Sequence, residues 1–183
     1  APTRVDAGHP MRVQFNDYGG PEEITLAPMQ RRQPGPGELE VAVQAAGLNF
    51  RDVLNLLGMM KTYYATALGI TQAKDVMVGF ECAGVVTAVG PDVTAFAVGD
   101  RVMGLGLRER TFASYVTVPA LQMTHIPQQL SAAEAATIPL TFMTAWYGLV
   151  ELAKLQPGEW VLIHAASGGV GQAAVQIALA LGA

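Results

Sequence analysis

The sequence predicts an α/β chain in which a β-rich segment precedes the first part of a parallel α/β unit. One observation is a series of short apolar runs separated by glycine and proline turns, which is typical of a small rolled or barrel-like sheet. The other is the stretch WVLIHAASGGVGQAAVQIALALGA at residues 160–183, which has the order strand, glycine-rich turn, helix. We therefore expect two domains, residues 1–130 and residues 131–183, the second of them incomplete.

Four strands are expected in the β-rich domain. Residues 38–47 alternate apolar and polar side chains, as a half-buried strand does. Residues 79–90, 98–105 and 112–119 are short apolar runs bounded by glycine or proline, which favours strands. Residues 61–77 are expected to form a loop.

One helix is expected between these strands, at residues 49–58. Four apolar side chains recur at helical spacing and give it one apolar face: Phe50, Val53, Leu54 and Leu57. Asn49 stands where an N-cap would stand, and Gly58 stands where a helix would end. Arg51 and Asp52 are interpreted as a local pair or a solvated face.

The pattern changes to α/β near Ser131, which opens a helix with the capping-box sequence SAAE. Pro139 should break or restart this helix, and residues 140–155 predict its continuation. Residues 161–163 are apolar without alternation, as in a parallel strand covered on both faces. His164 is then expected to be a hydrogen-bonded structural histidine on that strand.

The turn after this strand has the spacing of a dinucleotide-binding fingerprint, with Ala166 in place of the first glycine. Gly168 would let the backbone approach a pyrophosphate, and Gly171 would let the helix pack closely on the strand. The helix N-terminus would then offer free N–H groups to the phosphates. The alternative interpretation is a tight packing turn that binds no ligand.

Composition excludes several classes of function. The chain has 51% hydrophobic and 14% charged residues, a net charge of −4 and no Lys/Arg cluster, so a nucleic-acid partner is not expected. No signal peptide is predicted at residues 1–10, and no apolar run reaches the ~18–20 residues of a membrane span. Cys82 is the single cysteine, which fits a reducing compartment and predicts a cytoplasmic location.

Four ordered segments carry a family resemblance: GLNFRDVLNLLGM, GFECAGVVTAVGPDVTAFAVGDRVMG, TFASYVTVP, and the run from IPLTFMTAWYG to the final residue. With them the chain resembles the medium-chain dehydrogenase/reductase superfamily, and within it the enoyl reductase domains of type I polyketide synthases and the related animal fatty acid synthase. The resemblance implies a GroES-like substrate domain followed by the start of a Rossmann domain. It covers the N-terminal half of such a domain, so we expect a piece of a longer polypeptide that is inactive by itself.

The resemblance also implies an activity. An enoyl reductase takes hydride from NADPH to reduce an α,β-enoyl thioester held by the phosphopantetheine of an acyl carrier protein, beside other synthase domains. Three alternatives stay open: a zinc-free NADPH quinone oxidoreductase, a reductive ring-closing variant of the enoyl reductase, and a non-catalytic dinucleotide-binding module. The choice between NAD and NADP cannot be made from these residues, because the ribose-reading residue would follow Ala183.

The zinc branch of the superfamily is not expected. Phe80, in the sequence GFE, stands where a zinc-binding histidine would stand, and the segment around Asn49 occupies the early cysteine position. We therefore predict no metal site. Without a Lewis acid, hydrogen bonds and the hydride donor itself must activate the substrate, which suits an alkene conjugated to a thioester carbonyl.

The resemblance assigns cofactor contacts. Asn49 would lie near the nicotinamide, its alternative being a plain N-cap, and Thr144 would contact the same end of the cofactor, its alternative being a helix-surface hydroxyl. Five residues of the turn would cradle the pyrophosphate: Ser167, Gly168, Gly169, Val170 and Gly171.

The catalytic residues stay unknown, because the family's proposed Lys and Asp proton donors lie beyond Ala183. Met60 stands where many polyketide enoyl reductases carry a tyrosine, with Tyr63 and Tyr64 close behind. Four residues could line an acyl channel, although their helical spacing favours a core: Leu140, Phe142, Met143 and Trp146.

Overall fold

The computed structural model describes residues 9–183. Most of the N-terminal segment, for which the sequence predicts no signal peptide, lies outside the described residues. Two compact units make up the chain, the first ending at Ala136 and the second running Thr137–Ala183. No helix within residues 9–183 is long and apolar enough to cross a bilayer.

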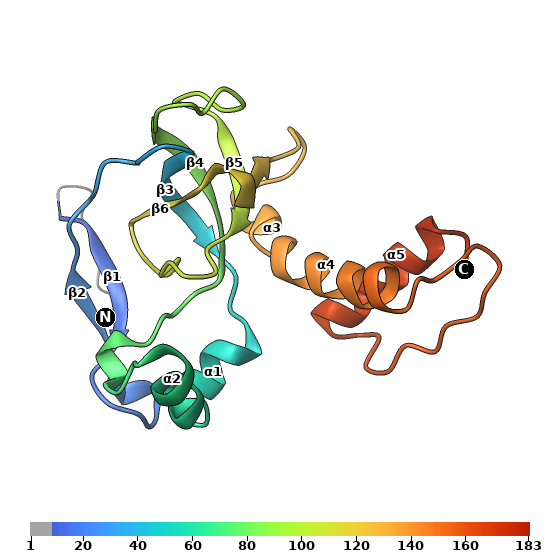
Figure 1. Cartoon of the computed structure of the whole chain (residues 1–183), viewed down its shortest axis with the longest axis horizontal. Coiled ribbons are helices and arrows are strands. Elements are labelled where there is room, and N and C mark those ends of the chain that lie inside the picture. The colour runs from blue at the N-terminus through green and yellow to red at the C-terminus, as the bar shows by residue number, and fades with distance from the viewer. Residues whose placement is uncertain (1–8) are drawn as a thin grey trace. The chain divides into compact units, whose positions relative to one another are not determined.

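The first unit holds seven strands among its described residues (Figure 1): β1 Met11–Phe15, β2 Ile24–Pro28, β3 Glu38–Ala46, β4 Glu81–Val89, β5 Arg101–Leu105, β6 Tyr115–Pro119 and β7 Met123–His125. It also holds three α-helices and three 3₁₀ turns: α1 Phe50–Leu56, α2 Lys61–Leu68, α3 Ala132–Ala135, Pro21–Glu23, Ala73–Asp75 and Ala120–Gln122.

Five strands form one sheet in the order β6-β3-β4-β5-β7, and every neighbouring pair is antiparallel. β1 and β2 pair separately, and β1 is bridged to the segment before β6, where Arg12 lies opposite Ala113 and the Val13 N–H donates to the Phe112 carbonyl at 2.8 Å. Figure 1 shows the main strands curling around a common interior. The β-rich first domain and its rolled sheet are therefore confirmed.

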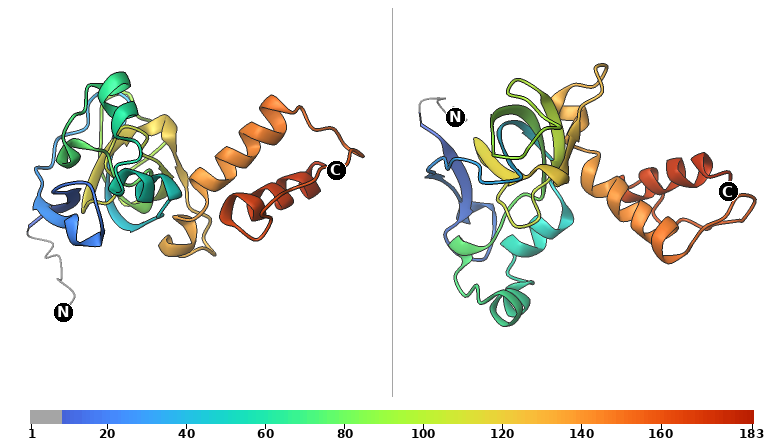
Figure 2. Two further views of the ribbon diagram at one scale, coloured as in Figure 1. Left: turned by 90° about the horizontal axis from the view of Figure 1, so that it is seen from below. Right: turned by 45° about the horizontal axis from the view of Figure 1, so that its top comes forward.

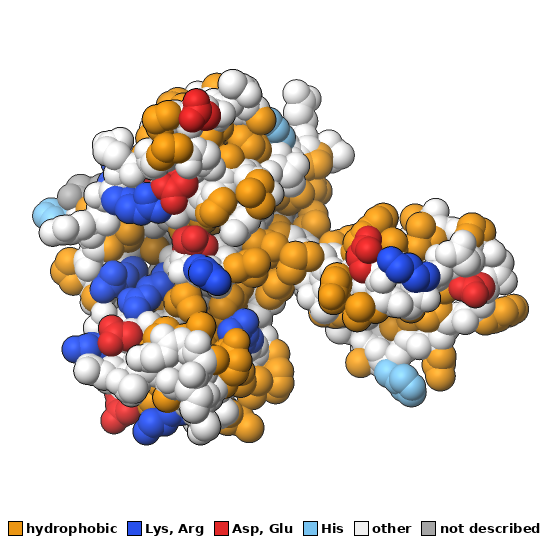
Figure 3. All heavy atoms as spheres, viewed as in Figure 1, with side chains coloured by type: hydrophobic (Ala, Val, Ile, Leu, Met, Phe, Trp, Pro, Cys, Tyr) orange, Lys and Arg blue, Asp and Glu red, His pale blue; other side chains and the backbone are white. Residues whose placement is uncertain are grey.

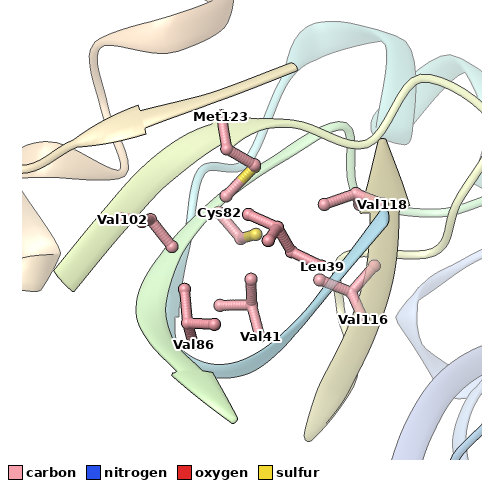
Figure 4. Close-up of a cluster of buried hydrophobic side chains, with 8 residues drawn as sticks. All are labelled: Leu39, Val41, Cys82, Val86, Val102, Val116, Val118 and Met123. Carbon is pink, nitrogen blue, oxygen red and sulfur yellow. The ribbon is translucent and has the colours of Figure 1, made fainter. Parts of the chain in front are cut away.

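The interior of this sheet is apolar. Eight buried side chains from five strands point toward one another in Figure 4: Leu39, Val41, Cys82, Val86, Val102, Val116, Val118 and Met123. β4 is buried on both faces, because Cys82 belongs to this cluster while the next residue, Ala83, belongs to a second cluster with Ile126. This explains why β4 shows no alternation of apolar and polar residues.

The helix α1 forms where the sequence predicts it, but its buried face is not the one expected. Phe50 is 75% exposed, and Leu57 is exposed as well. The buried residues of α1 are Asp52 and Asn55. The solvated-face interpretation of Asp52 is therefore wrong, and the apolar stripe of the helix points away from the core of this unit.

Two further expectations for the first unit need correction. Residues 61–77 are not a loop throughout, because they contain α2, which ends at Gly69 in a left-handed conformation. The strand β1 was not expected, although the sequence MRVQF alternates apolar and polar residues. The capping box at Ser131 is confirmed: the Glu134 backbone N–H donates to Ser131 Oγ at 3.2 Å.

The second unit contains α4 Pro139–Trp146, a π-helix Tyr147–Leu152 and α5 Gly169–Ala180. Both views of Figure 2 show α4 and α5 lying along one another, and Ala145 of α4 packs in one buried cluster with Ala173 and Ile177 of α5. Pro139 does restart a helix, as predicted.

The parallel strand expected at residues 161–163 is absent from the second unit. Trp160 is 100% exposed and Leu162 is 82% exposed. A strand needs hydrogen-bonded neighbours, and the residues described for this unit supply no second strand. His164 is also exposed, so the expectation of a buried structural histidine is wrong here.

Truncation of the barrel core tests its contribution to stability. We expect Leu39→Ala to lower the free energy of unfolding by about 2–5 kcal/mol, because Leu39 is fully buried and a cavity would remain. Urea denaturation followed by circular dichroism measures the loss. The matched control is Leu121→Ala, at a residue 89% exposed, where we expect a change below about 0.5 kcal/mol. Equal losses in both variants would contradict the assignment of the core.

Candidate functional site

The glycine-rich turn leads directly into α5 in the second unit. Gly168 is the N-cap in an extended conformation, and α5 begins at Gly169 with no side chain capping it and no acidic residue in its first turn. The first N–H groups of an α-helix have no partner inside the helix and carry a partial positive charge. This helix end can therefore receive an anion.

Gly171 has no room for a side chain. A Cβ placed there would overlap the carbonyl oxygen of Ala165 and come within 2.7 Å of Ala166 Cα. The opposite holds at Gly168, where an added Cβ would meet only the Ala165 oxygen, at 3.4 Å. The turn is thus closed on the Gly171 side and open on the Gly168 side, where a ligand could approach the backbone.

Hydrogen bonds hold the turn in this shape. The Gly168 N–H donates to the Ala165 carbonyl at 2.9 Å, and the Gln172 N–H donates to the Gly168 carbonyl at 2.8 Å. The Gln172 side-chain amide also donates to the Ser167 carbonyl at 2.8 Å. Ala165 has a positive φ of 51°, which an L-residue adopts only at a steric cost. Val170 is exposed on the first turn of α5.

Asn49 lies in the first unit, between the end of β3 and α1. It occupies the N-cap position, as expected, but its side chain reaches across to β4. The Asn49 side-chain amide donates to Glu81 Oε1 at 2.9 Å and to the Gly47 carbonyl at 3.3 Å. Glu81 is 2% exposed, so this bond to a carboxylate is formed away from solvent. Such a bond fixes the orientation of the asparagine amide.

Asp52 holds the backbone on both sides of this site. Its Oδ2 accepts the Asn49 N–H at 2.9 Å, and its Oδ1 accepts the Gly79 N–H at 2.8 Å. Gly79 has a positive φ of 78° and would collide with Phe112 if it carried a Cβ. Burial raises the pKa of Asp52, while the hydrogen bonds from Gly79 and Asn49 lower it in part.

A second polar group anchors α1 to α2. The Asn55 side-chain amide donates to Tyr64 Oη at 3.2 Å and to the Met77 carbonyl at 3.2 Å. The Arg51 guanidinium lies over the Phe80 ring, 4.8 Å from its centroid. Arg51, Asn55 and Tyr64 therefore act as packing residues, and Tyr64 is fully buried.

The other residues predicted for the site lie as follows. Thr144 is exposed, and its hydroxyl donates to the Leu140 carbonyl at 2.7 Å, as in a helix-surface hydroxyl. Met60 is half-buried at the start of α2. Met143 and Trp146 are exposed, whereas Phe142 packs against the buried cluster of the second unit. The cofactor contacts assigned to Asn49, Thr144 and the turn stay predictions.

Cys82, the single cysteine of the chain, is buried on β4 next to Glu81. Burial, and next to it the charge of Glu81, raises the pKa of Cys82 to about 12, so its thiolate is scarce. The described residues contain no group of three or more His, Cys, Asp and Glu suited to a metal ion.

Glu81 is the residue of this site that sequence reasoning missed. A carboxylate inside the apolar run GFECAGVV is rarely left buried without a partner, and this was the available signal. The partner is the Asn49 amide, 32 positions earlier in the chain. Periodicity does not reveal a pairing of that kind, because it depends on the antiparallel register of β3 and β4.

The chain is similar to known proteins in family, in sequence and in structure. The alcohol dehydrogenase GroES-like domain family matches residues 35–128. A mycocerosic acid synthase-like polyketide synthase of Mycobacterium tuberculosis is 43% identical over 173 residues, which are 94% of this chain and 8% of that protein. The spectinabilin polyketide synthase system protein NorB of Streptomyces orinoci is 46% identical over 179 residues, 94% of this chain and 7% of that protein.

Solved structures agree with these matches. The CurK enoyl reductase is 52% identical with a TM-score of 0.91, and the match covers 95% of this chain and 52% of that one. The CurF ER cyclopropanase from the curacin A pathway is 44% identical with a TM-score of 0.83 over 95% and 52%. The chain therefore spans about half the length of these solved proteins.

Two further structures are similar at lower identity. A quinone oxidoreductase of Pseudomonas syringae is 34% identical with a TM-score of 0.75, covering 94% of this chain and 50% of that one. A mycobacterial protein complexed with NADPH is 31% identical with a TM-score of 0.75, covering the same shares. The resemblance to polyketide enoyl reductases and their superfamily is confirmed.

Two glycine variants test the geometry of the turn. We expect Gly171→Ala to displace the turn from α5, because the new Cβ overlaps Ala165, and to speed amide hydrogen exchange in the first turns of α5. The matched control is Gly148→Ala, since a Cβ there meets nothing within 4 Å. Hydrogen exchange followed by mass spectrometry measures both. Unchanged exchange in Gly171→Ala would show that the turn does not depend on this contact.

Proposed function

The chain belongs to the alcohol dehydrogenase GroES-like domain family, and we propose that it forms the N-terminal half of an enoyl reductase domain of a polyketide synthase. The substrate proposed is an α,β-enoyl thioester carried on the phosphopantetheine of an acyl carrier protein. The observation that carries the proposal is the 52% identity and TM-score of 0.91 to the CurK enoyl reductase over 95% of the chain. Both values exceed those for the quinone oxidoreductase of Pseudomonas syringae.

NADPH is proposed as the cofactor, and the turn before α5 fits a dinucleotide. The open backbone at Gly168 and the uncapped N-terminus of α5 suit a pyrophosphate, which needs N–H donors and close approach. Ser167, Gly169 and Val170 would complete this cradle. The similar mycobacterial protein complexed with NADPH supports the choice. Bound NADPH would supply the hydride that reduces the β-carbon of the enoyl thioester.

Asn49 and Thr144 are proposed to contact the nicotinamide end. Asn49 suits this role because Glu81 and the Gly47 carbonyl fix its amide in one orientation. An amide held in this way can orient a ligand without first losing rotamer freedom. Thr144 is exposed, so its hydroxyl can be reached by a ligand.

The proton that must reach the α-carbon does not come from Met60, because a thioether has no acidic hydrogen. We propose that its donor lies outside residues 9–183. Similarity to the CurF ER cyclopropanase keeps a second reaction open, in which hydride attack closes a ring in a halogenated enoyl thioester. That reaction needs a leaving group in place of α-carbon protonation.

Substrate selection by a complete domain tests the proposal. The polypeptide would include this chain and a whole cofactor domain, and NADPH oxidation would be followed separately with a crotonyl pantetheine thioester, with a γ-halogenated enoyl thioester and with a simple quinone. We expect turnover with the thioester. Turnover with the quinone alone would replace the proposal by a zinc-free quinone oxidoreductase. Tight NADPH binding without turnover of the thioester, the quinone or a γ-halogenated thioester would indicate a binding module.

The role of Asn49 can be measured separately in the same polypeptide. We expect Asn49→Ala to lower kcat/KM for NADPH about tenfold or more, which corresponds to the loss of a hydrogen bond worth about 1.4 kcal/mol. The matched control is Asn16→Ala, at an exposed residue of the first unit, where no change is expected. Unchanged kinetics in both variants would leave Asn49 as a plain N-cap.

A further inference from the structure

The first unit contains a cavity of about 240 Å³ that is lined by four arginines. Arg12 comes from β1 and Arg110 from the segment before β6, while Arg31 and Arg32 follow β2. Figure 3 shows Lys and Arg side chains gathered on one face of this unit. The cavity holds more positive than negative charge, since Glu40 and Glu109 are the acidic residues of its wall.

Two of the four arginines are already neutralised. Arg31 Nε donates to Glu40 Oε1 at 2.9 Å, and its guanidinium stacks 4.0 Å from the centroid of the Tyr115 ring. Arg32 Nη2 donates to Glu38 Oε1 at 2.6 Å. The bond to Arg32 lowers the pKa of Glu38 to about 2, so this pair stays ionised at neutral pH. Neither arginine needs a ligand.

Arg12 and Arg110 differ from them. Arg12 Nε is buried and has no hydrogen-bond partner among the described residues. Burial is the largest cause that lowers the pKa of Arg110, and the charge of Arg12 is the next. Asp75 acts in the opposite sense but less strongly. Both guanidiniums line the same cavity, and Arg12 Nε is buried there, so two like charges share a partly desolvated place, which is unfavourable unless an anion lies between them.

We propose that Arg12 and Arg110 form a binding site for a phosphate group. A guanidinium presents its N–H donors in a planar fork that matches two phosphate oxygens, and the two guanidiniums outweigh Glu109, the remaining carboxylate of the cavity wall. The cavity is smaller than the roughly 300–1,000 Å³ of pockets for drug-sized ligands, so it suits one small charged group. The site lies within the first unit and does not depend on the proposed reductase activity.

Phosphate titration tests the site. The protein would be titrated with inorganic phosphate at constant ionic strength, and binding would be followed by NMR of the arginine Nε–H signals. We expect saturable binding that shifts the Arg12 Nε–H signal, and at least a tenfold rise of the dissociation constant in Arg110→Met. The matched control is Arg108→Met, at an exposed arginine two positions earlier in the same segment, which should leave the constant unchanged. Far-UV circular dichroism shows whether each variant is folded.

Titration with other anions shows whether the phosphate group belongs to a monoester or to a diester. Methyl phosphate represents a monoester ligand and dimethyl phosphate a diester, and saturable binding of either supports the site and identifies the kind of ligand. Acetate binding as tightly as phosphate would overturn the proposal in favour of a carboxylate site. An absence of saturable binding to the folded wild-type protein, or equal weakening in Arg108→Met and Arg110→Met, would also overturn it.

Discussion

The buried carboxylate of Asp52 is the contact on which the rest of the first unit's candidate site depends. It accepts the backbone N–H groups of Asn49 and Gly79, at 2.9 and 2.8 Å, and so ties the start of α1 to the segment that enters β4. With these two points fixed, the Asn49 side chain faces Glu81 across the β3–β4 pair. Because Asp52 and Asn55 are the buried residues of α1, Phe50, Val53 and Leu57 are exposed, whereas Leu56 packs against the buried cluster that contains Phe15 and Val78.

Sequence patterns predicted the elements that depend on local chemistry. The strand at residues 38–47, the capping box at Ser131 and the restart at Pro139 are each predicted from neighbouring residues, and all three are confirmed, although Glu40 of the strand is buried where alternation predicts a solvated side chain. The orientation of α1 could not be predicted in this way, because periodicity identifies an apolar stripe without showing which side of the helix is buried. The strand at residues 161–163 was expected from its composition, but a strand forms only beside hydrogen-bonded neighbours.

The features of the candidate site also differ in whether neighbouring residues were enough to predict them. The turn at residues 166–171 was found from glycine spacing, since the steric demand at Gly171 acts within six residues of chain. The pairing of Asn49 with Glu81 and the arginine cavity bring together residues far apart in the sequence, so no local pattern contained them. The same holds for β1, whose pattern alternates but whose partners are β2 and the segment around Ala113.

Amide hydrogen exchange at Asn49 and Gly79 tests the role of Asp52 most directly. In the wild-type protein both amides should exchange slowly, because each donates to a carboxylate that is 3% exposed. In Asp52→Asn at least one of these amides should exchange much faster. Asparagine keeps one side-chain oxygen as an acceptor but has an N–H₂ group, a donor, in place of the other, so it can accept only one of the two backbone N–H groups. The control is Asp17→Asn, at an exposed aspartate of the same unit. Fast exchange of both amides in the folded wild-type protein, or unchanged exchange in folded Asp52→Asn, would contradict the account.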